Sequence, residues 1–366
     1  MSTAAINARA PELLWRLARS PRFAGSAGEK AARDFCRLEL EGSGFACREI
    51  GFEYSEWPAR WGPPVAAALQ LVTILVVART SRNGNPFMAL VFATALLVAL
   101  ALVSRDARRR WPLRFPFLRA SGVNLEASRG KPSVWLVAHI DSKSQTVPML
   151  YRIVSVVLLN VLTAVALVAA LIQAGGNGEV MSYWLLLSLV AGVAALPSLL
   201  CMVRNDSAGA VDNASGVAAV LLGASRIPSD RPVGVLITSA EELGHAGARA
   251  WALSLGPGAR IVNCDTIDDS GDFLCMHTGS RPRLSAQAEA AAQGMGLKLR
   301  ARRLIPGILA DSVAFSDRGF EAITISRGSL ATLARIHTRR DNSAALTGSG
   351  IGEAATLLAA LTMELG

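Results

Sequence analysis

The sequence predicts an α/β fold, a mainly parallel or mixed central sheet flanked by helices, with four transmembrane helices inserted as two hairpins. Short β-rich runs alternate with helical runs over much of the chain, as expected for strands joined by crossover helices. Two pairs of long apolar runs interrupt that pattern. The 366 residues are 51% hydrophobic and only 18% charged, which also indicates membrane segments.

Residues 8–57 are expected to form a soluble segment at the start of the chain. LLWRLARS and GEKAARDFCRLELEGSGF have the apolar spacing of helices, and CREIGFEY is typical of a strand. Charged side chains interrupt the first twenty residues, so we expect no N-terminal signal peptide; they are Arg9, Glu12, Arg16 and Arg19.

The apolar runs have the length of membrane spans. The first hairpin is predicted over 58–106, with spans at 63–78 and 87–104, and the second over 148–203, with spans at 153–172 and 181–203. The run 153–172 contains no ionisable residue, and each central Leu, Ile or Val favours insertion by roughly 0.3–0.6 kcal/mol. We therefore expect a multi-pass protein of the bacterial inner membrane, with the lipid bilayer as a partner.

The basic residues predict the orientation of these spans. The formal net charge is +9, and we interpret the arginines as topology signals because the chain has no recognisable nucleic-acid motif. The hairpin tips carry only Arg79 and Arg82, whereas many Lys and Arg residues flank the other ends of the runs. The positive-inside rule then places the N-terminus and the globular domain in the cytoplasm.

The rest of the chain is predicted to form one discontinuous domain over 1–57, 107–147 and 204–366. Its strand candidates are SVWLVAH, VGVLITSA, RIVNCD and AITIS, and its helices are expected at 215–226, 244–255, 283–295 and 350–364.

Acidic and histidine side chains follow these strands or open a helix. His139 and Asp141 follow SVWLVA, Glu241 and Glu242 follow VGVLITSA, Asp265 ends RIVNCD, and Asp212 opens DNASGVAAVLLGAS. Because ligands bind beyond the carboxyl ends of strands in such sheets, we expect these groups to converge. Imidazole and carboxylate suit zinc, and three carboxylates with one hydroxide would offset two divalent cations.

Neighbouring residues suggest divided roles. One of the adjacent Glu241 and Glu242 can bind metal while the other stays free as a general base for water. Asp141 is placed to orient His139. His245 and His277 fit no ligand pattern and are expected at the surface or at a pocket rim, and Cys264 is expected to pack in a strand. The five cysteines have no CxxC spacing and are expected as free thiols.

Five motifs together resemble the dizinc aminopeptidase family, metallopeptidase family 28, which includes bacterial leucyl aminopeptidases. They are VAHIDS, DNASGVAA, SAEELGHAGARA, VNCD and IHTRRDN. RFAGSAGEKAARDFCRLELEGSGF and ADSVAFSDRGFEAITI are similar to further parts of that family. The family is related to glutamate carboxypeptidase, transferrin receptor and glutaminyl cyclase, so the resemblance implies a zinc-exopeptidase-like fold.

The resemblance also implies the roles of single residues. It places His139 and Asp265 on one zinc, Glu242 and His337 on the other, and Asp212 between both, with Glu241 as general base and Asp141 supporting His139. The sequence departs from the family pattern in two places: Val211 replaces an acidic residue, and Arg339 and Arg340 replace a proline and an acid. Because of the second departure, the resemblance does not define the edge of the substrate pocket.

The expected function is therefore that of a membrane-bound zinc aminopeptidase. It would hydrolyse N-terminal residues from a peptide substrate with water activated by two zinc ions. Two alternatives remain: a catalytically inactive receptor or scaffold, and aminoacyl cyclisation like that of glutaminyl cyclases. The residue preference and the oligomeric state are not encoded in these motifs.

Overall fold

The computed structural model describes residues 3–176, 181–304 and 310–365. The chain divides into two compact units. We call the first the globular unit; it comprises Met1–Glu56, Pro112–Ser144 and Arg204–Gly366. We call the second the helical unit; it comprises Trp57–Trp111 and Gln145–Val203.

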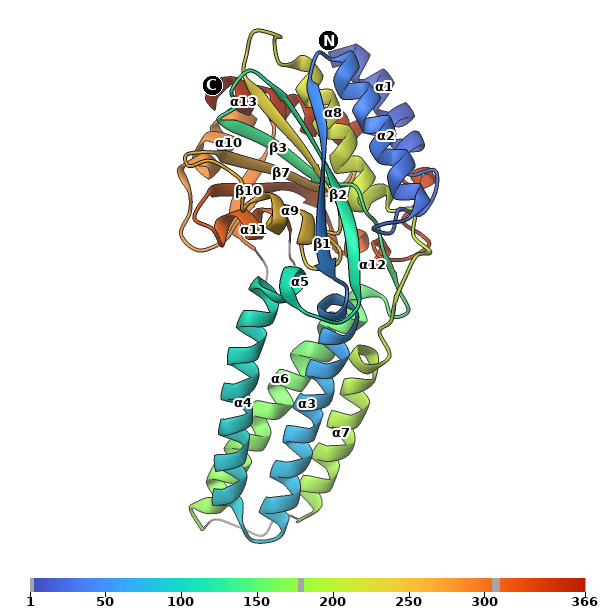
Figure 1. The fold of residues 1–366 in the computed structure, drawn as a ribbon. Coiled ribbons are helices and arrows are strands. Elements are labelled where there is room, and N and C mark those ends of the chain that lie inside the picture. The colour runs from blue at the N-terminus through green and yellow to red at the C-terminus, as the bar shows by residue number, and fades with distance from the viewer. Residues whose placement is uncertain (1–2, 177–180, 305–309, 366) are drawn as a thin grey trace. The chain divides into compact units, whose positions relative to one another are not determined.

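The globular unit is built on an eight-stranded sheet, visible in Figure 1, with the strand order β1-β2-β6-β3-β7-β10-β8-β9. The strands are β1 Ala46–Ser55, β2 Arg119–Arg129, β3 Val134–His139, β6 Val233–Thr238, β7 Arg260–Ile267, β8 Asp272–His277, β9 Leu299–Arg303 and β10 Glu321–Gly328. The four central strands β6, β3, β7 and β10 are parallel. Two short strands, β4 Ser144–Gln145 and β5 Val203–Arg204, form a separate pair.

The predicted strands are confirmed, and the sheet is mixed. Strands β3 and β6 are buried along their whole length, as expected for parallel strands covered on both faces. Antiparallel pairing enters through β2, which runs against β1 and β6, and through β8, which runs against β10. The apolar pattern did not predict β2 because its inward positions include the polar residues Asn124 and Glu126.

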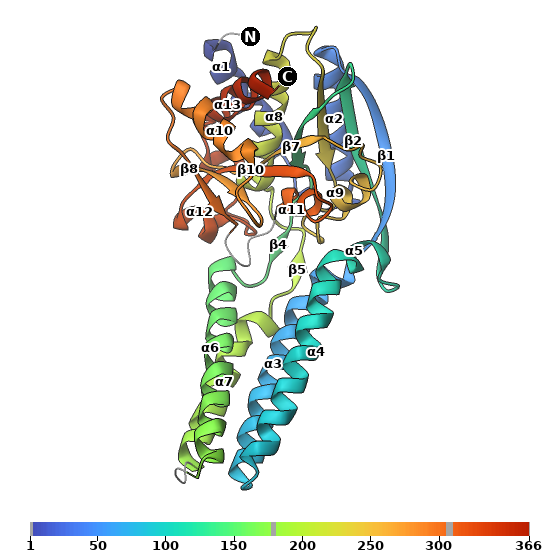
Figure 2. The ribbon, with the colours of Figure 1, turned by 90° about the vertical axis from the view of Figure 1, so that its left-hand side faces the viewer.

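Helices cover both faces of this sheet, as the two views in Figures 1 and 2 show. Trp135 and Val137 of β3 pack on one face with Trp251 and Phe315, which belong to or border the short helices α9 (Ala246–Trp251) and α11 (Ser312–Ser316). Helices α8 (Ser215–Arg226) and α13 (Ser349–Leu365) contact each other and strands β3 and β7. Helices in contact with this pair are α1 Thr3–Leu17, α2 Ala27–Gly42 and α10 Arg283–Gly294. Two further short helices are α5 Trp111–Arg114 and α12 Leu330–Arg335.

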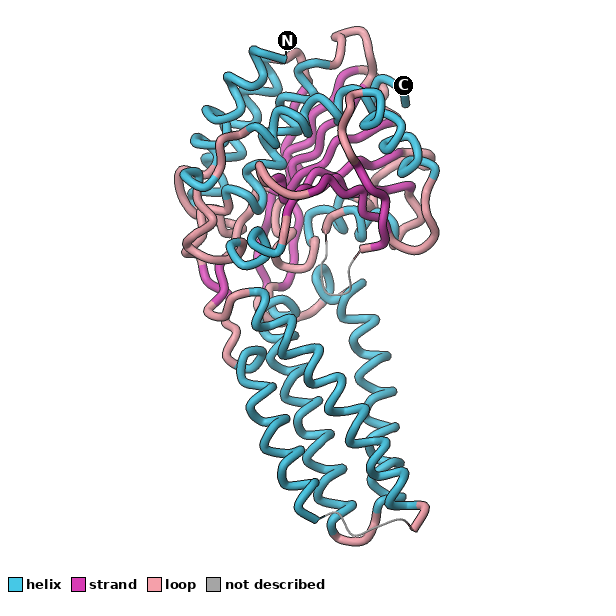
Figure 3. Tube along the Cα trace, turned by 180° about the vertical axis from the view of Figure 1, so that it is seen from behind, coloured by secondary structure: helices cyan, strands magenta, loops and turns pink. Residues whose placement is uncertain are grey.

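The helical unit consists of four helices, drawn as cyan tubes in Figure 3. They are α3 Trp57–Arg82, α4 Pro86–Arg109, α6 Met149–Ala174 and α7 Met181–Leu199. Helix α3 contacts the other three, and many of the buried residues between them are alanines, which allow close helix packing.

Three of these helices are long and apolar enough to cross a membrane, over Trp57–Arg82, Pro86–Val103 and Met149–Ala174. The fourth apolar stretch, Tyr183–Leu199, is shorter. Length and composition therefore support three of the four predicted spans, and the arrangement of four spans as two hairpins stays a prediction.

Hydrogen bonds cross the interior of the helical unit. Ser155 Oγ donates to the carbonyl oxygen of Ala194 at 2.6 Å, and Gln173 Oε1 accepts from the Trp184 indole N–H at 3.1 Å. Polar side chains of these helices thus find hydrogen-bond partners on neighbouring helices.

Candidate metal centre

The predicted ligands come together at the carboxyl ends of the parallel strands. His139 ends β3, Asp265 lies near the end of its neighbour β7, and Glu242 follows β6 on the other side of β3. Asp212 lies in an irregular turn, Ala210–Ala214, directly before α8, which spans Ser215–Arg226 as predicted. His337 follows α12. Five side chains from separate parts of the sequence therefore share one edge of the sheet.

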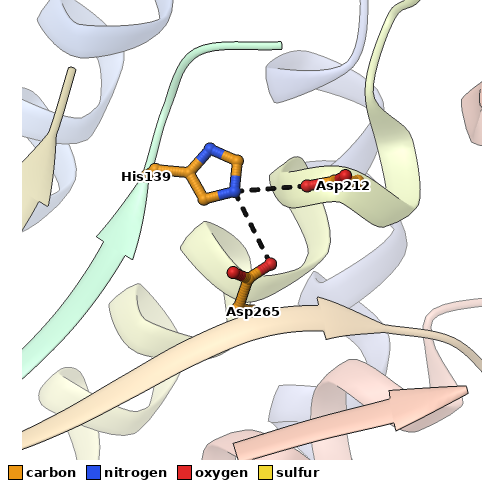
Figure 4. A group of neighbouring side chains, drawn as sticks. All are labelled: His139, Asp212 and Asp265. Atoms are coloured by element: carbon orange, nitrogen blue, oxygen red, sulfur yellow. Dashed lines mark ion pairs between the residues drawn. The ribbon is translucent and has the colours of Figure 1, made fainter. Parts of the chain in front are cut away.

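His139, Asp212 and Asp265 form the first group that could hold a metal ion, shown in Figure 4. His139 Nε2 lies 3.2 Å from Asp212 Oδ1 and 3.5 Å from Asp265 Oδ1. All three residues are buried.

Asp212, Glu242 and His337 form the second group. His337 Nε2 lies 3.0 Å from Asp212 Oδ2 and 3.2 Å from Glu242 Oε1. Asp212 therefore turns one carboxylate oxygen toward each group, which is the arrangement of a residue shared between two neighbouring cation sites.

The donor atoms suit a small divalent cation. Within each group they lie within 4.8 Å of one another, and tetrahedral zinc ligands at about 2.0–2.1 Å from the ion are themselves about 3.3 Å apart. His139 Nε2 and Glu242 Oε1 are buried without a hydrogen-bond partner among the described residues. Buried polar atoms are seldom left unpaired, so the absence of a hydrogen-bond partner at one atom of each group fits a cation in each group.

The electrostatics also call for positive charge. Burial opposes protonation of His139, yet Glu241 and Asp265 raise the pKa of His139 well above its usual range. Burial likewise opposes ionisation of Asp212 and Glu242, but the two histidines beside Asp212 lower the pKa of Asp212, and His337 and Lys143 lower that of Glu242 to about 2. With these carboxylates ionised, protonated imidazoles supply the charge that a metal cation would supply instead.

Glu241 belongs to neither group. Its Oε2 lies 4.0 Å from His139 Nε2, and its Oε1 lies 3.2 Å from His245 Nε2. Burial, with the nearby carboxylates, raises the pKa of Glu241 well above its usual range. A buried carboxyl group that favours its protonated form is suited to holding a proton during a reaction.

Asp141 contacts three of these residues. Its backbone carbonyl oxygen lies 3.1 Å from His139 Nδ1, and its carboxylate accepts the backbone N–H groups of Glu241 and Glu242, each at 3.1 Å. Its Oδ1 is 3.6 Å from His139 Nδ1. The contact with the imidazole thus runs through the Asp141 backbone, while the side chain holds the backbone of the glutamate pair.

Strained backbone conformations surround the groups. Ala240, His245, Thr266 and His337 have φ between 55° and 60°, in the left-handed region that non-glycine residues seldom adopt. Each lies beside a carboxylate of the cluster or is itself a member of it. Such strain is typical of functional sites, where the surrounding structure holds the side chains in place.

Several residues of the site were not predicted. Lys143 Nζ lies 2.6 Å from Glu242 Oε2, and Asp311 Oδ2 accepts from the Thr238 hydroxyl at 2.5 Å. Burial raises the pKa of Asp311 to about 7. Asp311 lies in the segment ADSVAFSDRGFEAITI and Lys143 directly follows the motif VAHIDS, but only their surroundings in the fold reveal these contacts.

The segment after His337 supports the shared ligand through Asp341. Its carboxylate accepts the backbone N–H groups of Val211 at 2.7 Å and Asp212 at 3.2 Å. Arg339 and Arg340, which depart from the family pattern together, are exposed, and Arg339 lies 3.4 Å from Asp206. Arg340 stands where the family pattern has an acidic residue, and Asp341, one position later, supplies a buried carboxylate that we did not predict.

The two remaining histidines differ from the prediction. His245 is buried against Glu241 and is not a surface residue; burial lowers the pKa of His245 to about 3, so its imidazole is neutral. His277 ends β8 and is also buried, outside both metal-ligand groups. Cys264 is buried in β7, and burial raises the pKa of its thiol, as expected for a packing residue.

The fold and the site together define an α/β protein with a buried carboxylate and histidine cluster at the carboxyl edge of its sheet. The family model of peptidase family M28 matches residues 123–362, and the chain belongs to this family. No curated protein matches the sequence.

Solved structures share this fold at low sequence identity. An aminopeptidase from Aneurinibacillus sp. strain AM-1 is 13% identical to this chain, with a TM-score of 0.57. The match covers 99% of this chain and 96% of the aminopeptidase chain. A zinc aminopeptidase from Bacillus subtilis is 14% identical with a TM-score of 0.57, covering 98% and 95%. A glutaminyl cyclase from Fimbriiglobus ruber is 14% identical with a TM-score of 0.54, also covering 98% and 95%.

Proposed function

We propose that the protein is a zinc-dependent aminopeptidase that removes N-terminal residues from peptides. The observation that carries the proposal is the pair of ligand groups that share Asp212, with Glu241 within 4.0 Å of His139 and a member of neither group. Membership of a peptidase family and the likeness to zinc aminopeptidases support it.

His139 and Asp265 would hold one zinc ion, Glu242 and His337 the other, and Asp212 both. Bound zinc polarises a carbonyl oxygen and makes water a stronger nucleophile. The residues present fit two ions in ligand type and spacing.

The chain's own groups account for the proton transfer. Glu241 takes the proton of the attacking water and passes it to the leaving amine, and its burial keeps its proton affinity high enough for both steps. His245 lies within 3.2 Å of Glu241 Oε1 and holds that oxygen, while Asp141 fixes the backbone of the glutamate pair.

Replacing Glu241 with glutamine tests this role. We expect Glu241→Gln to lower kcat by roughly 10²–10⁴-fold while zinc content stays at the wild-type value, because the amide cannot carry the proton. Glu126→Gln is the matched control, since Glu126 is also a buried glutamate but pairs with Arg48 and Trp251 away from the cluster. Full peptidase activity of zinc-loaded Glu241→Gln would refute the mechanism.

A second candidate is cyclisation of N-terminal glutamine, which the likeness to glutaminyl cyclases favours. Assays of peptides with N-terminal Gln, following both free amino acid and pyroglutamyl product, separate the two reactions. A purified protein that binds no divalent cation would instead favour a receptor or scaffold.

We further propose that the globular unit is the peptidase domain and that the helical unit lies in a bacterial inner membrane. Three helices of sufficient length and hydropathy support this placement. The distribution of Lys and Arg favours a cytoplasmic peptidase domain. Reporter fusions between residues 174 and 181 test the orientation, and a cytoplasmic reporter signal there would contradict it.

A further inference from the structure

Arg22 is a buried arginine whose side chain donates hydrogen bonds to backbone carbonyl oxygens. It is 1% exposed and lies between α1 and α2. Its Nε donates to the carbonyl oxygen of Ile140 at 2.7 Å, and its Nη2 donates to that of Gly209 at 3.0 Å. Its Nη1 donates to the carbonyl oxygens of Leu17, at 2.8 Å, and of Ala208. Desolvating a guanidinium is costly, so these contacts indicate a specific role.

The carbonyls that Arg22 binds belong to two segments that carry metal-site residues. Ile140 follows His139 directly, and Gly209 precedes Asp212 by three positions. Between the two segments the chain leaves the globular unit for Gln145–Val203. We call residues 140–144 and 204–209 the neck of this insertion.

Further hydrogen bonds hold the two sides of the neck together. Ser142 Oγ accepts the backbone N–H of Arg22 at 3.0 Å and donates to the carbonyl oxygen of Ser207 at 3.0 Å. The backbone N–H of Ser142 donates to the carbonyl oxygen of Arg22 at 3.0 Å. The backbone N–H of Asp206 donates to Ser144 Oγ at 2.8 Å. Arg22 therefore belongs to a continuous network that spans the neck.

Close packing at Gly209 completes the neck. Gly209 has φ of 58°, and a Cβ there would lie 2.4 Å from the carbonyl oxygen of Asp212 and 2.5 Å from Ser142 Cβ. Only glycine lets the two segments approach so closely beside the Arg22 guanidinium.

From these contacts we propose that Arg22 is a positioning residue for the metal centre, fastening the segments of His139 and Asp212 to each other across the neck. Two ligands of one ion that are separated by a long insertion are poorly fixed unless the insertion is closed at its base. A planar guanidinium reaches both sides at once, which a single ammonium group cannot do. The proposal rests on the zinc site proposed above, and Arg22 lies outside the residues that the family model matches.

The same N-terminal segment supports the glutamate pair. Glu29 Oε1 accepts from the Ser239 hydroxyl at 2.5 Å, and its Oε2 accepts the backbone N–H of Gly25 at 2.7 Å. Ser239 precedes Glu241 by two positions. Residues 22–29 thus contact the segments that carry three of the five ligands.

Zinc affinity of the full-length protein in detergent tests the proposal. We compare wild type, Arg22→Lys and Arg33→Lys by competition with a chromogenic chelator, and follow the Co²⁺ absorption spectrum and the thermal unfolding of each metal-free protein. Arg33 is the matched control because it is a buried arginine of α2 that pairs with Glu49 at 3.0 Å, not with the neck. We expect Arg22→Lys to weaken zinc binding about 10–100-fold, the usual effect of losing a group that orients ligands, and Arg33→Lys to bind like wild type.

Ser142→Ala gives a milder second variant, since it removes one hydroxyl of the neck and leaves the guanidinium in place. We expect a loss of zinc affinity about two- to fivefold, smaller than that of Arg22→Lys. Wild-type zinc affinity in Arg22→Lys, or in Ser142→Ala if Arg22→Lys does not fold, overturns the positioning role. A wild-type protein that binds no zinc overturns the proposed function, and the positioning role with it.

Discussion

The interior of the globular unit holds many charged side chains, whereas the buried polar residues of the helical unit are all uncharged hydroxyls, among the residues described. Those of the helical unit are Thr73, Ser81, Ser155, Thr163 and Ser198. The surfaces differ in the opposite sense, because most of the exposed large apolar side chains lie in the helical unit. One unit therefore concentrates charge inside and the other places apolar groups outside.

This contrast teaches what each unit requires from its surroundings. A cluster of buried carboxylates is stable only with compensating cations, which protonated histidines or metal ions supply. An apolar exterior of this extent is stable only against another apolar phase, such as lipid. The buried carboxylates of the globular unit thus call for positive charge, and the exterior of the helical unit is suited to an apolar environment.

The largest effect is expected from a charge on the exterior of the helical unit. Leu158 near the middle of α6 is 44% exposed, and Leu38 of α2 in the globular unit is 68% exposed. Leu158→Arg should cost about 3–4 kcal/mol of insertion free energy if this surface faces lipid, because a favourable leucine is lost and a costly arginine is gained. Leu38→Arg should change little because its surface faces water. The measurement is the amount of folded protein recovered from membranes. Equal recovery of the two variants would contradict the contrast.

A smaller effect is expected from one buried carboxyl group of the globular unit. Burial raises the pKa of Glu29 from 4.5 to about 7, so its neutral form is favoured in the folded state. The contribution of Glu29 to the free energy of unfolding is fully present below about pH 4.5. This contribution, about 3 kcal/mol, is lost as the pH rises through 7.

Urea unfolding of the metal-free protein at pH 5 and pH 8 measures this loss. Glu29→Gln mimics the neutral carboxyl group, so it should be less sensitive to pH and more stable than wild type at pH 8. An identical pH dependence in the variant and in wild type would show that Glu29 does not carry the effect.

The smallest effect is expected inside the helical unit. Ser155→Ala removes the hydrogen bonds to the Ala194 carbonyl oxygen and to Ser198 Oγ, which lies at 2.8 Å, and should destabilise the unit by about 1 kcal/mol. Ser188→Ala is the control because Ser188 Oγ bonds only within its own helix, to the Trp184 carbonyl oxygen at 2.8 Å. Unfolding in mixed micelles compares the two, and a larger loss for Ser188→Ala would argue against the interhelical bonds.

The central strands and the metal-site cluster were accessible from sequence for the same reason. Strands such as β3 are wholly apolar, and each ends at a residue whose chemistry stands out from its surroundings, as His139 does after SVWLVA. Strand β2 was missed because Asn124 and Glu126 occupy buried positions, where each has a hydrogen-bond partner from another part of the chain, Gly247 and Trp251 respectively. A local pattern does not reveal such partners.

The supporting residues of the site could not be predicted for a related reason. Arg22 binds backbone carbonyl oxygens, and Asp341 binds backbone N–H groups. Because nearly every residue carries these backbone groups, the sequence does not show which of them will be partners. Asp141 lies beside His139 as expected, but its nearest contact with the imidazole comes from its backbone oxygen, which the motif does not reveal. Long-range contacts with the main chain therefore mark the limit of what the motifs encode.

The order of the ligands along the chain has a consequence for biosynthesis. The ribosome completes the helical unit at Val203, before it has added Asp212, Glu242, Asp265 or His337. Both ligand groups include Asp212, so neither is complete at that moment. The apolar helices of the nascent chain are therefore made before either group can bind an ion. For the proposed zinc enzyme, metal binding would therefore follow synthesis of the helical unit, and a shortage of zinc would affect the globular unit alone.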